Sequence, residues 1–163
     1  LEAGAPFGPI IAIGDPRNPI PPLGAARIFV RNADQDWKSV VADLIAACRA
    51  VVICPHTSSG VAWEIEQVRP PTVLARTIIL ASPKMSAEDT SSLFAEITGG
   101  PITLKRRQRA VAAFQDPVDG WTLLSARCLT VQTYTVALNR AIQHLLQPGP
   151  DRPARRGASA LGK

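Results

Sequence analysis

The sequence predicts a three-layer α/β/α domain built around a mainly parallel β-sheet. Three short, continuous apolar runs, at residues 9–13, 51–54 and 77–81, are each ended by glycine or proline within two residues. Such runs are typical of strands that are covered on both faces. Segments with helical periodicity alternate with them, which favours parallel strands joined by helices. The 163 residues, 46% of them hydrophobic, suffice for one packed core.

In the first half of the chain, the strand over 9–13 is followed by a loop with four prolines in residues 16–24. Proline fixes its own backbone and donates no hydrogen bond, so this loop is expected to be stiff and exposed. Residues 27–30 predict a short edge strand. The clearest helix covers 34–50, where apolar residues recur at helical spacing behind aspartates suited to its N-terminus. A second helix is expected over 60–68.

In the second half, Ser86 and Asp89 form a capping pattern for a helix that Gly99 ends. Four further elements are expected: a short strand over 102–104, a basic helix over 105–115 with Val111 and Phe114 inward, a strand over 121–126 and a helix over 133–147. We therefore predict a single domain over residues 1–147 and a disordered basic tail over 148–163.

The net charge of +5 is concentrated in that tail and in the cluster at residues 105–109. No aromatic stacking residues accompany these cations, so a solvated helix face is favoured and a nucleic-acid partner is disfavoured. The three cysteines lack metal-ligand spacing and indicate neither a metal site nor a disulfide framework. We expect Cys54 in the core and a cytoplasmic location.

Ligands of parallel sheets bind where loops leave the carboxyl ends of strands. This rule selects the loops 14–22, 55–60 and 82–85. On a helix after the second of these loops, Val61, Ile65 and Val68 form the buried stripe and Glu64 lies at its margin, whereas Trp63 and Glu66 face solvent. Glu64 is then either a functional carboxylate or a surface residue that bonds a neighbouring amide.

The string from Cys54 to Glu66, CPHTSSGVAWEIE, resembles the strand, polar glycine loop and glutamate-bearing helix of the nucleoside 2-deoxyribosyltransferase and Toll/interleukin-1 receptor (TIR) superfamily. The first half of the chain is also similar to an uncharacterised bacterial domain found beside transmembrane helices. The resemblance implies a flavodoxin-like sheet and a catalytic Glu64 acting at the ribose C1 of a nucleoside or NAD. By comparison with these families, the domain is expected to lack their first strand and helix. The residues expected to hold phosphate or ribose are Gly14, Asp15, Thr57, Ser58, Ser59 and Gly60. Trp63 is a further residue expected to bind the ligand.

Two hypotheses follow from the residues and the resemblance. The first is a TIR-like bacterial signalling or interaction module, with nucleotide or NAD as its ligand, which forms homo-oligomers and reaches a membrane only through segments outside this chain. The alternative is an N-glycosidase or deoxyribosyltransferase that uses Glu64, because a fixed carboxylate stabilises the cationic ribosyl species formed when the N-glycosidic bond breaks. Neither hypothesis calls for a cofactor or a metal.

Overall fold

A computed structural model describes residues 10–13, 25–28, 34–55, 59–101, 103–116 and 120–146. This part of the chain is a mixed α/β structure with the following elements: β1 (Ile10–Ile13), β2 (Ala25–Ile28), α1 (Asp34–Ala47), β3 (Val51–Ile53), α2 (Ser59–Val68), α3 (Pro71–Leu74), β4 (Thr77–Leu80), α4 (Ala87–Thr98), β5 (Arg109–Asp116), β6 (Gly120–Ala126) and α5 (Val131–Leu146). The expected proline-rich loop and the basic tail lie outside the described residues.

The central sheet has four strands in the order β3-β4-β5-β6, and β1 and β2 form a separate parallel pair. Strands β3 and β4 are parallel, whereas β4 and β5, and β5 and β6, are antiparallel. The prediction of a mainly parallel sheet was therefore wrong, because the sheet is mixed. Only three residues separate β5 from β6. A parallel pair needs a connection of about a dozen residues, so these strands can only run in opposite directions.

The expected basic helix over 105–115 was also wrong. Residues 105–108 form a turn, closed by a 2.9 Å hydrogen bond from the Gln108 amide to the Lys105 carbonyl. The chain then continues as strand β5, which is buried at six of its eight positions. An alanine-rich segment can form either a helix or a strand. Here residues 109–116 lie between two strands and are covered on both faces, which favours the strand. The strand expected over 102–104 does not form at Thr103 or Leu104.

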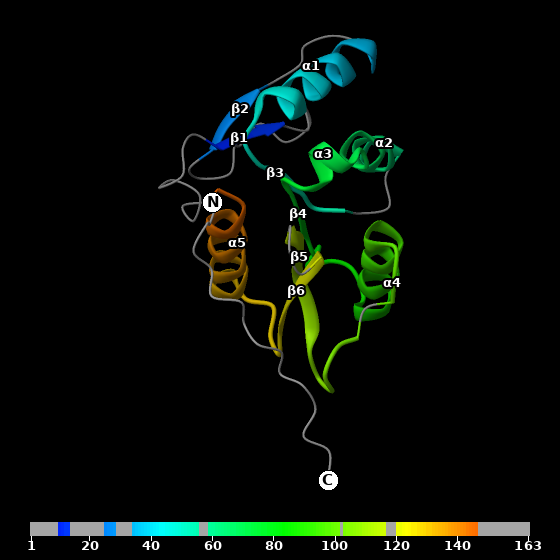
Figure 1. The fold of residues 1–163 in the computed structure, drawn as a ribbon, viewed down its shortest axis with the longest axis vertical. Helices are drawn as coiled ribbons and strands as arrows, with labels where there is room; N and C mark the ends of the chain where they lie inside the picture. The colour runs from blue at the N-terminus through cyan, green and yellow to red at the C-terminus, as the bar shows by residue number, and fades with distance from the viewer. Residues whose placement is uncertain are drawn as a thin grey trace.

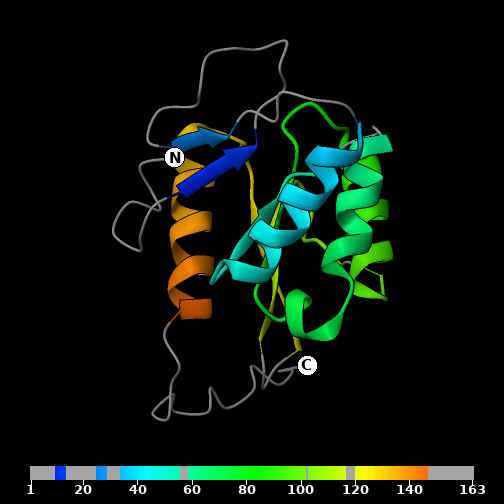
Figure 2. The ribbon, with the colours of Figure 1, turned by 90° about the horizontal axis from the view of Figure 1, so that it is seen from above.

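Helices cover both faces of the central sheet, as Figures 1 and 2 show. Residues of α5 pack on one face against β4 and β5, and residues of α2 and α4 pack on the other. A β-bulge at Val111 lies between Ala110 and Ala112 in β5. An extra residue reverses which way the following side chains point. Ala110 consequently faces α2 and α4, whereas Ala112 faces α5.

Local signals for helix ends are confirmed at α4. Its N-cap Ser86 accepts a hydrogen bond from the Asp89 amide at 3.0 Å. Its C-cap Gly99 has φ of 73°, a left-handed conformation that glycine adopts without steric cost. These two residues fix the limits of α4 without help from the rest of the fold.

Helix α1 ends differently, because it has no basic residue in its last turn. Arg76, immediately before β4, supplies the positive charge instead. Its guanidinium donates to the carbonyl oxygens of Ile45, at 2.5 Å, and of Cys48. These carbonyls at the end of α1 have no partner within the helix, so one arginine satisfies them and joins α1 to the sheet.

Candidate functional site at the carboxyl edge of the sheet

The segments that matter for binding meet at one edge of the central sheet. Strands β3 and β4 end there, and because β5 is antiparallel to β4, β5 begins there. Strand β6 ends at the same edge, where Ala126 lies opposite Arg109. Figure 1 shows the chain entering β5 and leaving β6 at the lower end of the sheet. We call this the carboxyl edge, after the ends of β3 and β4.

Four of the residues expected to bind a ligand, Gly14, Asp15, Thr57 and Ser58, lie outside the described residues. Ser59 begins α2, and its side chain also lies outside them. Gly60 is the second residue of the helix, and a β-carbon there would meet the Trp37 ring at 3.9 Å. That distance is ordinary van der Waals contact, so the position would accept a small side chain.

The expected geometry of α2 is confirmed around Glu64. Val61, Ile65 and Val68 are only 8%, 8% and 1% exposed and pack against the sheet. Glu64 is half-buried, between that stripe and the exposed side of the helix, and it is engaged in an interaction. The residue is thus partly shielded from water on a helix that follows the carboxyl end of β3.

Trp63 does not face solvent as expected, because α1 covers that side of α2. Its ring meets the Trp37 ring edge to face, with centroids 5.1 Å apart. The ammonium of Lys38 lies 5.7 Å from the Trp63 centroid and 5.9 Å from that of Trp37. Edge-to-face aromatic pairs with a cation nearby stabilise packing, so Trp63 fastens α1 to α2.

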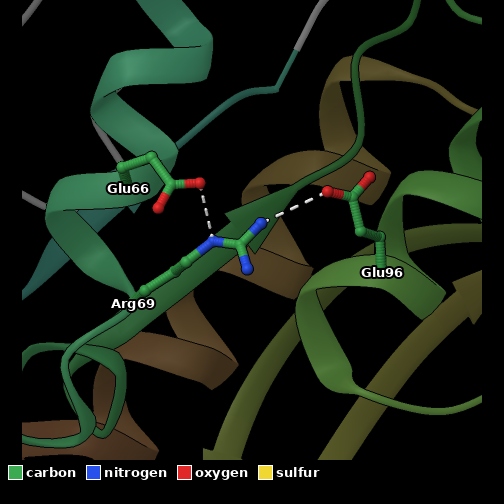
Figure 3. Close-up of polar contacts among 3 residues, drawn as sticks. All are labelled: Glu66, Arg69 and Glu96. Carbon is green, nitrogen blue, oxygen red and sulfur yellow. Dashed lines mark hydrogen bonds and ion pairs between the residues drawn. The ribbon is translucent and has the colours of Figure 1, made fainter.

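Glu66 is exposed, as expected, and belongs to a charged bridge between two helices (Figure 3). Arg69 Nε lies 3.0 Å from the Glu66 carboxylate, and Arg69 Nη2 lies 3.2 Å from that of Glu96 on α4. All three side chains remain largely in water, where such pairs contribute at most about 1 kcal/mol. Glu66 therefore serves as a comparison for Glu64: the same residue type on the same helix, but outside the shielded margin.

Positive charge gathers at the carboxyl edge. The cations are Lys84, Lys105, Arg106, Arg107, Arg109 and Arg127, and all but Arg109 are exposed. Among the described residues, the carboxylates that flank them are Glu88 and Asp89, in the first turn of α4. The sequence located part of this cluster but placed it on a helix, whereas a turn and two strand ends assemble it. Arg107 adopts φ of 64° within that turn, which is uncommon for a residue with a side chain.

Cys54 and Tyr134 lie at the same edge on the side covered by α5. Cys54 was expected in the core, but it follows the last residue of β3 and reaches solvent. Enough protein still surrounds its sulfur for burial to raise the pKa of the thiol. Burial also raises the pKa of the Tyr134 hydroxyl, Cys54 raises it further, and the charge of Arg109 lowers it.

At the opposite edge, Asp116 ends β5 and forms an ion pair with His144 in the last turn of α5. The His144 Nε2 and Asp116 Oδ2 atoms are 2.6 Å apart, and the two side chains are only 13% and 10% exposed. The His144 ring also packs 4.7 Å from that of Phe114. No sequence pattern indicates this pair, since Asp116 and His144 lie on different elements, 28 residues apart.

No protein-family model, curated protein or solved structure that was compared with this chain matches it. Within the described ranges, no helix is long and apolar enough to cross a membrane. The same ranges contain no group of three or more histidine, cysteine or carboxylate side chains arranged to hold a metal ion.

Proposed function

We propose that this chain is a TIR-like interaction module that binds a nucleotide at the carboxyl edge of its sheet. Helices on both sheet faces support a three-layer arrangement related to the flavodoxin-like one, with β5 and β6 reversed. A cytoplasmic location and self-association are parts of the same proposal. The proline-rich loop over residues 16–24 would offer a surface for such association, and it lies outside the described residues.

The placement of Glu64 carries this proposal. A carboxylate accepts hydrogen bonds from the vicinal hydroxyls of ribose, and acidic residues near strand ends bind ribose in many α/β proteins. Glu64 is half-buried on α2, at the side of a buried apolar stripe. Partial burial strengthens a hydrogen bond to a ligand, because water competes less for the acceptor. The cations of the carboxyl edge supply attraction for the phosphates.

Isothermal titration of the chain with ATP and with NAD tests the proposal. Loss of one hydrogen bond to a charged group costs about 1.5–3 kcal/mol, so Glu64→Gln is expected to weaken binding about 10- to 100-fold. Glu66→Gln is the matched control and should leave the affinity nearly unchanged. The absence of saturable binding to either nucleotide, or equal effects of the two substitutions, would contradict the proposal.

The same half-buried carboxylate supports a second candidate, an N-glycosidase or deoxyribosyltransferase. Glu64 would then stabilise or attack the cationic ribosyl carbon as the base departs. Chromatography of the chain incubated with NAD or with deoxynucleosides would detect the free base. If Glu64→Gln releases the free base as fast as the original chain, Glu64 does not have this catalytic role. If the chain binds the nucleotide but releases no base, the interaction module is the function that the result supports.

A further inference from the structure

The last strand of the central sheet, β6, has a free side that the nucleotide site does not use. Among the described residues, β6 pairs only with β5, which lies on one side of it. In an antiparallel sheet, alternate residues direct their N–H and C=O groups to opposite neighbours. About half of the backbone groups of this seven-residue strand therefore point away from β5, where another strand can pair with them.

The sequence of β6 carries none of the features that usually prevent pairing at the side of a sheet. Natural edge strands are protected by charged side chains, by proline or by shortness. The strand at the other side of the sheet, β3, has only three residues. Strand β6 has seven, with the sequence GWTLLSA, which contains neither a charged residue nor a proline. Such a strand can pair with a second strand over its whole length.

Strand β6 also keeps apolar surface that pairing would cover. None of its seven residues is fully buried, whereas six of the eight residues of β5 are. Trp121 and Leu123 pack on the face of α2 and α4, and Leu124 packs on the face of α5. Both faces of the strand are thus apolar and half-buried. A strand added beside β6 would remove more of these three side chains from water.

The distribution of charge favours antiparallel pairing of two copies. Arg109 and Arg127 lie at one end of the β5-β6 pair, and the ion pair of Asp116 with His144 lies at the other. A parallel arrangement would bring the two cationic ends together. In an antiparallel arrangement, the cationic end of each copy lies beside the Asp116 end of the other, about 24 Å from its like-charged counterpart. That distance exceeds the screening length of about 8 Å at physiological ionic strength.

We propose that two copies of this chain associate by antiparallel pairing of β6 with β6, which joins their two four-stranded sheets into one. The inference rests on the proposed self-association and names the surface that makes it. A two-fold axis lets the same strand serve both copies and closes the assembly at a dimer. Pairing over the whole strand centres the axis on Leu123, the middle residue, and places Thr122 opposite Leu124 of the second copy.

Sedimentation velocity over a range of protein concentrations tests the proposal, and association into dimers is expected. Thr122→Lys would place the two new lysines at diagonal positions across the axis, about 7–8 Å apart. Like charges this close should weaken dimerisation at least about tenfold. Gln143→Lys adds the same charge at an exposed position of α5 and is the matched control, which should leave the dissociation constant nearly unchanged.

Hydrogen exchange followed by peptide mass spectrometry gives a second measurement that needs no variant. Pairing protects the amides of β6 that point away from β5, so exchange over residues 120–126 should slow as the protein concentration rises. Circular dichroism establishes whether Thr122→Lys is folded. A chain that stays monomeric at every concentration, a folded Thr122→Lys that dimerises as well as the original chain, or β6 exchange that does not depend on concentration overturns the proposal.

Titration with ATP and NAD separates this outcome from failure of the nucleotide site. Monomeric Thr122→Lys should bind nucleotide as the original chain does, because Glu64 lies on α2 and not on β6. A chain that dimerises through β6 but binds no nucleotide would contradict the nucleotide site and support the pairing. Dimers that Thr122→Lys leaves intact would support self-association and overturn β6 as its surface.

Discussion

Replacement of Arg76 by glutamine tests whether one side chain holds α1 against the sheet. Arg76 donates to the carbonyl oxygens of Ile45 and Cys48 at the end of α1, and its side chain is half-buried. A hydrogen bond to a charged group contributes about 1.5–3 kcal/mol. Water can reach part of this site and replace some of the lost bonding. We therefore expect the two contacts together to contribute about 2–3 kcal/mol to the free energy of unfolding.

For a chain of this size, 1 kcal/mol corresponds to about 2–4 °C, so Arg76→Gln should lower the melting temperature by about 4–12 °C. Circular dichroism at 222 nm during thermal and urea unfolding measures the change. Arg69→Gln is the matched control, since Arg69 also bridges separate helices but does so in water. That substitution should cost less than about 1 kcal/mol. An effect of Arg76→Gln no larger than that of Arg69→Gln would refute the reasoning.

Two further predictions concern the His144–Asp116 pair and the Cys54 thiol. His144→Ala removes the imidazole whose Nε2 lies 2.6 Å from the nearly buried Asp116 carboxylate. Loss of a hydrogen bond to a charged group is expected to lower the free energy of unfolding by about 1.5–3 kcal/mol. In urea unfolding, the double substitution with Asp116→Ala should cost less than the sum of the two single ones. Burial raises the pKa of Cys54 above its ordinary value of 9.0, so its alkylation, followed by peptide mass spectrometry, should rise at higher pH in the folded chain than in urea. Because the folded state holds the thiol proton more tightly than the unfolded state, this group adds to the free energy of unfolding below about pH 9, and the contribution is lost as the pH rises further. Alkylation profiles that coincide in the folded and the urea-unfolded chain would contradict this prediction.

The strand and helix limits that depend on local chemistry could be predicted from the sequence. Ser86 and Gly99 bound α4 because a side-chain cap and a left-handed glycine act over a few residues. Three strands were expected from continuous apolar runs, and β1, β3 and β4 all lie within those runs. The stripe of α2 followed from helical spacing alone, and so did the position of Glu64 at its margin.

The contacts around the candidate site were harder to predict from the sequence, because the residues that make them come from distant segments. No local pattern connects Asp116 with His144, since β5 and α5 meet only in the folded chain. Trp63 was expected to face solvent because a single helix gives no information on its neighbours. In the structure, Trp37 of α1 packs against the Trp63 ring and covers it.

By itself, the sequence predicted the helices α1, α2, α4 and α5, the capped ends of α4, and an α/β protein. Only the tertiary structure showed that residues 105–116 form a turn and a strand rather than a helix, and that β5 runs antiparallel to β4. The apolar run Ala110–Phe114 fits both a helix and a doubly covered strand, since alanine favours the helix and burial on two faces favours the strand. Pairing with β4 and β6 satisfies the buried backbone groups of this run, and no spacing along the chain encodes that pairing.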